Sequence, residues 1–211
     1  GESVGAFYGY QSQGIVRERH LLYTPPYNGT RLQEGDIKFI DKDGDGNVTE
    51  KDRTVIGNPN PSYRYGLSTR AAWRNLSLTV TMDGAADFDI MNLNLLNTAT
   101  FATGNYSNLR SDSYRKAYPA GGEPRLNAVG ADVVSSRFVE DGSYLRLSNV
   151  QVSYRFDIGR KWLRSVDLAF TAKNLCVLTG YSGYSPMVGS YTYDLSRYGA
   201  VSYTHLRAHE P

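Results

Sequence analysis

Alternation between apolar and polar residues is the clearest pattern in this chain, and it predicts β-strands. In residues 63–71 mostly apolar side chains recur at every second position. Residues 76–83 show the same alternation after a tight turn at 73–75. The two segments read as a β-hairpin, because side chains two residues apart lie on the same face of a strand. Each strand has about ten residues, the length that a tilted strand needs to cross a bilayer. One face would carry Tyr63, Tyr65, Leu67, Thr69, Ala71, Leu76, Leu78, Val80 and Met82.

The same alternation predicts further strands on both sides of this hairpin. In residues 143–156 the apolar positions change phase next to Ser148 and Asn149, which indicates a β-bulge. Within residues 165–175, Val166, Leu168, Phe170 and Ala172 alternate with Asp167, Ala169, Thr171 and Lys173, and GAFYGYQSQGIV at residues 5–16 reads as one more strand. The chain is therefore predicted to be all-β, with about six antiparallel strands.

The connections between these strands alternate in length. Those at residues 73–75 and 157–165 are short, whereas those around 16–61, 86–132 and 175–200 are long. Long structureless loops are uncommon in compact soluble domains, but outer-membrane barrels combine short periplasmic turns with long external loops. A soluble β-sandwich gives the same alternation and stays open as an alternative. About six strands cannot close a barrel, so we expect the isolated chain to have open sheet edges and to aggregate.

Composition supports the all-β prediction and excludes several classes of function. The 211 residues include 17 Tyr and 21 Gly, and the net charge is only +2, so nothing favours nucleic-acid binding. Cys176 is the single cysteine, which excludes an internal disulfide. No apolar run is long enough for a spanning helix, and the first residues lack the pattern of a signal peptide. We expect either a cytosolic protein or an internal piece of a longer chain.

The last residues, VSYTHLRAHE at 201–210, match one reading frame of a transposon-based sequencing adapter. A match of this length is not expected by chance. We therefore predict that residues 201–211 are adapter read-through and not native protein. Residues 1–200 would be the native part, interrupted near Ala200.

The stretch DKDGDGNVTEKD, from Asp41 to Asp52, has the spacing of a calcium-binding loop, with Gly46 at the sharp turn. Three carboxylates so close together would repel one another without a cation, and Ca²⁺ is a hard ion that prefers oxygen. The flanking segments read as extended chain and turn, which argues against an EF-hand sensor with moving helices. The alternative interpretation is a turn rich in Asp and Gly that binds no ion. We predict a structural Ca²⁺ in an external loop, with ligands Asp41, Asp43, Asp45, Asn47 (through its carbonyl), Thr49 and Asp52.

Other polar residues give no catalytic constellation, and we expect no enzyme. His20 has no neighbour suited to a metal site, and nothing fixes the separation of Asp87 from Asp89 or of Glu140 from Asp141.

The aromatic residues fall into two groups. One group, near strand ends, is predicted to form a girdle at a membrane interface: Tyr63, Tyr65, Tyr154 and Phe156. The other group lies in the last long loop and contains weak candidates for stacking on sugar rings or for contact with a partner: Tyr181, Tyr184, Tyr191 and Tyr193.

Three segments resemble a known family. GDIKFIDKDGDGNVTEKDRTVIGNPNPSYRYGLS (35–68), SSRFVEDGSYLRLSNVQVSY (135–154) and AKNLCVLTGYSGYSPMV (172–188) are similar, in this order, to passages of SusC/RagA-type TonB-linked outer-membrane transporters. The resemblance extends over nearly all of residues 5–188. Cys176 stands where Phe is common, and Ser185 replaces the usual Asp, so any role of that carboxylate is missing here.

This resemblance implies a C-terminal part, about six strands, of a 22-stranded barrel that encloses a plug and is driven through TonB. It also implies contact with outer-membrane lipid, a SusD-like surface lipoprotein as a lid, and an oligosaccharide or peptide as cargo. The plug, the TonB-contacting segment and the closing strand would lie outside the chain. The alternative is a secreted, calcium-stabilised β-sandwich that binds carbohydrate.

Overall fold

The computed structural model describes residues 1, 3–93, 95–96, 123–125, 127–160, 163–183 and 185–187, and the backbone of 201–209. In this part of the chain, no helix is long and apolar enough to cross a membrane. The all-β prediction is confirmed. The strands and 3-10 turns (η) are β1 (Phe7–Gly9), β2 (Ser12–Ile15), η1 (Glu18–His20), β3 (Ile37–Phe39), η2 (Glu50–Asp52), β4 (Thr54–Gly57), β5 (Tyr63–Trp73), β6 (Leu76–Ala86), β7 (Asp89–Met91), η4 (Ser136–Phe138), β8 (Val139–Asp141), β9 (Tyr144–Arg160), β10 (Leu163–Thr179) and β11 (Val201–His209).

The chain divides into two compact units. The first, here called the loop unit, comprises Gly1–Asn60, Asp89–Glu140 and Val188–Asp194. The second, the sheet unit, comprises Pro61–Phe88, Asp141–Met187 and Leu195–Pro211.

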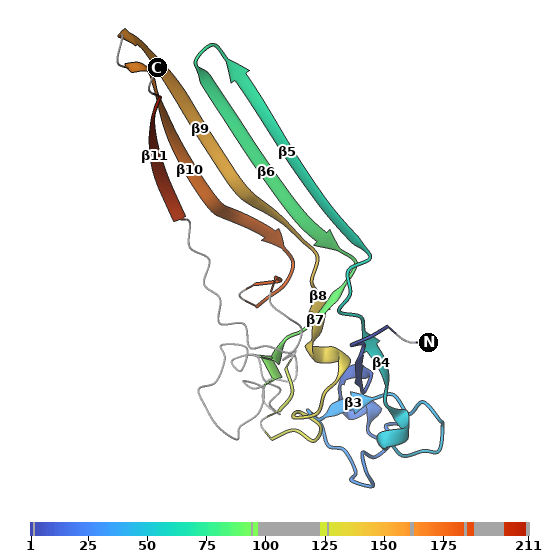
Figure 1. The fold of residues 1–211 in the computed structure, drawn as a ribbon. Coiled ribbons are helices and arrows are strands. Elements are labelled where there is room, and N and C mark those ends of the chain that lie inside the picture. The colour runs from blue at the N-terminus through green and yellow to red at the C-terminus, as the bar shows by residue number, and fades with distance from the viewer. Residues whose placement is uncertain are drawn as a thin grey trace. The chain divides into compact units, whose positions relative to one another are not determined.

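The sheet unit contains one antiparallel sheet of five strands in the order β11-β10-β9-β6-β5 (Figure 1). The predicted hairpin is confirmed, since β5 and β6 pair from Tyr63 with Ala86 to Trp73 with Leu76. β9 and β10 reach further than predicted. The connection expected over residues 157–165 is mostly strand, and Gly159 takes a left-handed φ of 64° inside β9.

The predicted bulge is also confirmed, and it lies at Ser148. Asn149 is opposite Thr81 of β6, and the next pair is Leu147 with Met82, so Ser148 is an extra residue. Its Oγ donates to the Thr81 carbonyl at 3.0 Å. Because one extra residue moves the following side chains to the other face, the apolar positions before and after the phase change lie on a single face.

The two faces of this sheet differ sharply in polarity. The exposed large apolar side chains on one face range from 39% exposed for Leu78 to 70% for Trp73. We call this the apolar face, and the opposite one, rich in hydroxyl, amide and charged groups, the polar face. The apolar face consists of Tyr63, Tyr65, Leu67, Trp73, Leu76, Leu78, Val80, Met82, Leu145, Leu147, Val150, Val152, Tyr154, Phe156, Val166, Leu168, Phe170, Cys176 and Leu178.

On this face, Tyr65 of β5 lies over Gly84, its partner in β6, and its hydroxyl donates to the Tyr144 carbonyl at 2.7 Å. A Cβ on Gly84 would lie 2.3 Å from the Tyr144 carbonyl oxygen and 2.5 Å from the Tyr65 ring. We therefore expect Gly84→Ala to lower the unfolding temperature of the full-length protein in detergent. Gly66→Ala is the control, because the nearest atom to a Cβ there is 3.8 Å away. Equal melting of the two variants would contradict this account.

The loop unit has a small core of its own. Tyr10, Ile37, Phe39 and Val48 are buried together, and the Tyr27 ring lies 5.6 Å from that of Tyr10. The connection predicted over residues 16–61 is thus a folded part of the protein, with strands, turns and a core, and not a structureless loop.

The prediction of a single strand over residues 5–16 is wrong. β1 pairs with β4 and β2 pairs with β3, and neither joins the five-stranded sheet. Gly14 has φ 91°, which interrupts regular strand geometry. At Gly9 the backbone passes so close to another segment that a Cβ would lie 2.5 Å from the Val134 carbonyl oxygen. Alternation predicted extended chain correctly, but it carries no information about which segment, from 22 to 50 residues further along the chain, pairs with it.

Residues 201–209 form β11, which pairs with β10 opposite residues 165–173. Pairing of this kind uses backbone groups, so it is compatible with many sequences. The adapter origin of this segment stays a prediction.

Candidate functional site

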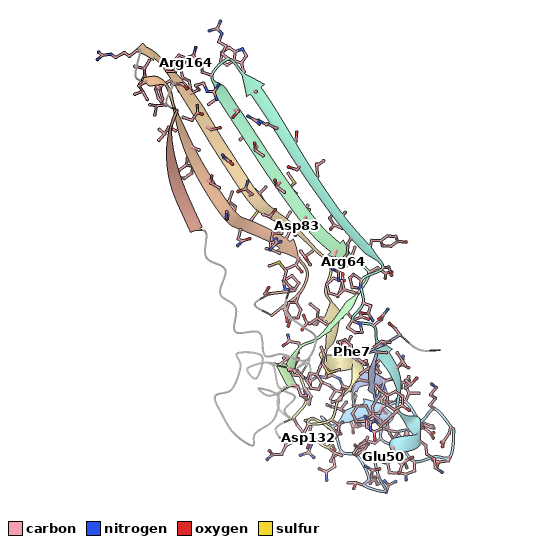
Figure 2. The ribbon with its side chains drawn as sticks, in the orientation of Figure 1. Phe7, Glu50, Arg64, Asp83, Asp132 and Arg164 are labelled. Carbon is pink, nitrogen blue, oxygen red and sulfur yellow. The ribbon has the colours of Figure 1, made fainter. Side chains whose placement is uncertain are left out.

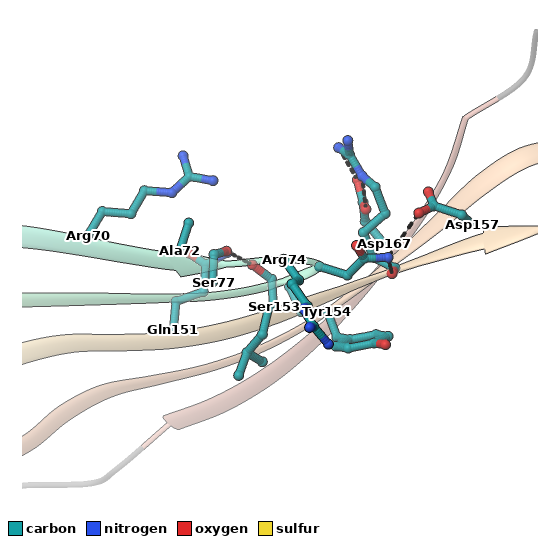
Figure 3. Close-up of a pocket in the computed structure, with 13 residues that line it drawn as sticks. Arg70, Ala72, Arg74, Ser77, Gln151, Ser153, Tyr154, Asp157 and Asp167 are labelled. Carbon is teal, nitrogen blue, oxygen red and sulfur yellow. Dashed lines mark hydrogen bonds and ion pairs between the residues drawn. The ribbon is translucent and has the colours of Figure 1, made fainter.

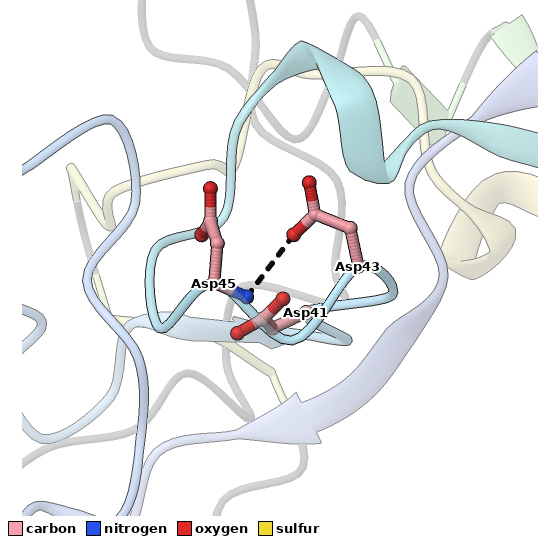
Figure 4. A group of neighbouring side chains, drawn as sticks. All are labelled: Asp41, Asp43 and Asp45. Atoms are coloured by element: carbon pink, nitrogen blue, oxygen red, sulfur yellow. Dashed lines mark hydrogen bonds between the residues drawn. The ribbon is translucent and has the colours of Figure 1, made fainter.

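The predicted calcium loop lies in the loop unit, between β3 and η2. Oxygen atoms of Asp41, Asp43 and Asp45 lie within 4.8 Å of one another, and Asp43 and Asp45 are exposed (Figure 4). The structure therefore brings together three of the six predicted ligands.

Backbone hydrogen bonds hold these three carboxylates in place. Asp41 accepts from the Gly44 N–H through Oδ1 (2.7 Å) and from the Gly46 N–H through Oδ2 (2.8 Å). Gly44 and Gly46 have φ values of 75° and 86°, which glycine adopts without strain. Asp43 and Asp45 each accept one backbone N–H through Oδ1. The arrangement fits a hard cation, since closely spaced carboxylate oxygens repel one another.

The other three predicted ligands have different surroundings. Asp52 is buried, and its carboxylate accepts from the N–H groups of Lys42 (2.6 Å), Asp43 (3.2 Å) and Thr49 (2.7 Å). Burial raises the pKa of Asp52, but these hydrogen bonds outweigh it, and the net shift is downward. Thr49 forms a capping box with Asp52, and the Asn47 side chain accepts from the Gly29 N–H at 2.9 Å. In this geometry Asp52 closes the loop and lies outside the convergent group.

The remaining candidates have structural partners. Asp89 accepts from the Asn58 N–H, Glu140 from the Asn92 side chain and Asp141 from Ser143. Burial and the neighbouring cations, first Arg19, lower the pKa of His20.

The two groups of aromatic residues that the sequence singled out have different surroundings in the structure. Tyr181 is only 7% exposed and covers Gly183, which disfavours stacking on a ligand. Tyr184, Tyr191 and Tyr193 lie outside the described residues. The four predicted girdle residues are all on the apolar face, exposed by 42–67%.

Pairs of charged residues on the polar face were not evident from the sequence. Arg146 Nη2 lies 2.7 Å from Asp83 Oδ2 (Asp83 is labelled in Figure 2), and Arg155 Nε lies 2.8 Å from Asp167 Oδ1. Each pair joins neighbouring strands, so only the strand register brings the partners together.

Comparison with known proteins agrees with this architecture. No family model matches the chain. TonB-dependent receptor P3 of Formosa agariphila is 30% identical over 193 residues, which is 88% of this chain and 19% of that receptor. TonB-dependent receptor SusC of Bacteroides thetaiotaomicron is 22% identical over 191 residues, 84% of this chain and 18% of SusC.

Solved structures share the fold. The RagAB peptide transporter aligns with a TM-score of 0.68 and 19% identity, over 88% of this chain and 20% of that chain. The "open-open" RagAB peptide importer aligns with a TM-score of 0.72 and 19% identity, over 94% and 21%. The chain thus spans about a fifth of the length of the relatives it matches. Its sequence similarity places the chain among the TonB-dependent receptors, and its strand arrangement is the fold of the RagAB structures.

Proposed function

We propose that the chain forms part of an outer-membrane importer that is energised through TonB. The observation that carries this proposal is a sheet with an exposed apolar face and a polar opposite face. In a transmembrane barrel the apolar face contacts lipid and the polar face lines the interior. A soluble β-sandwich would instead cover the apolar face with a second sheet at about 10 Å. The relatives are receptors, which favours transport over catalysis.

The dimensions of the apolar face support this proposal. Tyr63 and Trp73 lie at the two ends of β5. Ten steps along a strand span about 33 Å, and a tilt of about 40° reduces this to about 25 Å, the height of the apolar band in such barrels. Tyr65 lies near one end of the hairpin, whereas Tyr154 and Phe156 lie near the other, with ring centroids 4.6 Å apart. Two aromatic rows of this kind suit the two interfaces of a membrane.

We further propose that the cargo is an oligosaccharide or peptide and that a SusD-like surface lipoprotein covers the barrel. The similarity to SusC and to the RagAB peptide importer supports this assignment.

Uptake by cells tests the importer. Deletion of the gene for the full-length protein should abolish entry of either a fluorescent oligosaccharide or a fluorescent peptide into the periplasm. Collapse of the proton-motive force in undeleted cells should have the same effect, because TonB transmits that energy. Uptake that persists after both treatments, or a protein absent from the outer membrane, would contradict the proposal.

We also propose that Asp41, Asp43 and Asp45 hold a Ca²⁺ ion that stiffens the loop unit. In Asp43→Asn and Asp45→Asn the Oδ1 acceptor is kept while one charge is lost. Each should weaken Ca²⁺ binding to the full-length protein by about tenfold or more, measured by calorimetry. Glu50→Gln is the control, because Glu50 is exposed and outside the cluster. Equal affinities in all of these variants would argue for a turn without an ion.

A further inference from the structure

Charge on the apolar face of the sheet is confined to one end, where β5 and β9 end and β6 and β10 begin. We call this the turn end. Arg74, in the turn between β5 and β6, holds its guanidinium 5.2 Å from the ring of Trp73, the last residue of the apolar face in β5. Arg164 precedes Val166 of β10 by two residues, so it lies on the same face. Both arginines are exposed, and Arg164 lies at the opposite end of the sheet from Arg64 (Figure 2). Elsewhere on this face the described residues are uncharged.

The turn itself does not favour an arginine at position 74. Arg74 and Asn75 form the two-residue connection between Trp73 and Leu76, which pair with each other. Arg74 has a φ of 52°, in the left-handed region that Gly, Asn or Asp usually occupies in such a turn. The local backbone therefore does not explain why a long cationic side chain stands here.

The turn end carries more positive than negative charge. Its described charged residues are five arginines and two aspartates: Arg70, Arg74, Arg155, Asp157, Arg160, Arg164 and Asp167. Both aspartates line a hollow on the polar face, where Arg155 donates to both oxygens of Asp167, at 2.8 and 3.2 Å (Figure 3). Asp157 accepts from the Asn75 side chain at 2.9 Å. The other four arginines make no ion pair with another residue whose side chain the structure describes. The cations on the apolar face thus have no carboxylate to neutralise them among these residues.

The surroundings of these two arginines combine a cationic rim with an apolar surface. Trp73, Leu76 and Tyr154 form one row across β5, β6 and β9, each opposite the next, and each is exposed. A guanidinium binds a phosphate group through paired N–H donors. A ligand that fits both features joins an anionic phosphate to an apolar body, as an anionic phospholipid does. A free phosphate ion would leave the apolar row uncovered.

We propose that the turn end of the apolar face binds anionic phospholipid, with headgroup phosphate at Arg74 and Arg164 and acyl chains against the row of Trp73, Leu76 and Tyr154. The inference rests on the proposed function, because only a sheet that spans a membrane presents this face to lipid. Short turns of outer-membrane barrels are periplasmic, so the lipid belongs to the leaflet on that side. The site does more than contact lipid, since uncompensated arginines select a headgroup with net negative charge.

Photo-crosslinking of the full-length protein in vesicles tests this selection. One set of phosphatidylcholine vesicles would contain a small fraction of phosphatidylglycerol with a photoactivatable group in its acyl chain, and the other the same fraction of phosphatidylcholine with that group. Both lipids carry a phosphate, but the choline cation offsets its charge. At Trp73 and Tyr154 we expect about tenfold more attachment of phosphatidylglycerol. At Tyr63 and Leu178, at the other end of the face, the two lipids should attach equally.

Two double variants with the same loss of charge show which arginines are responsible. Arg74→Gln with Arg164→Gln should bring the two lipids to about equal attachment at Trp73 and Tyr154. Arg64→Gln with Arg70→Gln removes two arginines from the polar face of β5 and should leave the tenfold preference unchanged. Attachment sites would be mapped by mass spectrometry after digestion with chymotrypsin, because these substitutions leave its cleavage sites intact.

The same experiment separates this inference from the proposed function. Attachment of either lipid at Leu67 and Leu78, in the middle part of the face, reports contact with lipid. If neither lipid attaches there, the sheet does not face a membrane, and both the importer and the phospholipid site are contradicted. If both attach there but equally at Trp73, or if the two double variants keep the same preference, the phospholipid site alone is overturned.

Discussion

Asp36→Ala is expected to destabilise the loop unit by about 3–5 kcal/mol. The Asp36 carboxylate is fully buried and accepts from the N–H groups of Gln33 (2.8 Å) and Val129 (3.0 Å) and from Arg125 Nε (2.7 Å). It joins the segment before β3 to a segment about 90 residues later. Removing it leaves two backbone donors and a guanidinium without their acceptor.

Hydrogen–deuterium exchange of the full-length protein measures this effect. Amides of β3 should exchange about 100-fold faster or more in Asp36→Ala. Asp36→Asn keeps an oxygen acceptor and should have a smaller effect, and exposed Glu50→Ala sets the baseline. If Asp36→Ala exchanged no faster than Glu50→Ala, the buried carboxylate would not be what joins the two segments.

Phe170→Arg is expected to reduce the stability of the protein in a membrane by about 2–4 kcal/mol. Phe170 is 52% exposed on the apolar face, opposite Val152 of β9. In water, an arginine at such an exposed position would be tolerated, but in lipid the charge has no solvent. The substitution therefore distinguishes a lipid-facing surface from an exposed soluble one.

The control for this substitution is Ser68→Arg on the polar face of β5, where Ser68 is exposed. Both full-length variants would be refolded into lipid vesicles and unfolded with guanidinium chloride. A clear loss of stability for Phe170→Arg alone is the expected result. Equal stabilities would mean that the apolar face does not contact lipid.

The sequence by itself determined the strands and the polarity of their faces. Alternation is a local property, because side-chain direction repeats every two residues whatever the partner strand. β5, β6 and most of β9 and β10 could be predicted for this reason, and so could the bulge at Ser148, which is visible as a change of phase. The convergence of Asp41, Asp43 and Asp45 is local in the same sense, since a few glycine-rich residues fold it.

Only the tertiary structure decided which segments meet. The strand assignment for residues 5–16 failed because β1 finds its partner in β4, and alternation holds no information about partners. The contact of Asp36 with Arg125 and the pairing of Arg155 with Asp167 depend on chain packing and strand register. The same is true of Arg74 and Arg164, which come from two different hairpins and share one end of the apolar face only when the strands between them align. Asp52 shows that sequence spacing can mislead even within a single loop. Its position fits a metal ligand, but its buried carboxylate accepts hydrogen bonds from three backbone N–H groups.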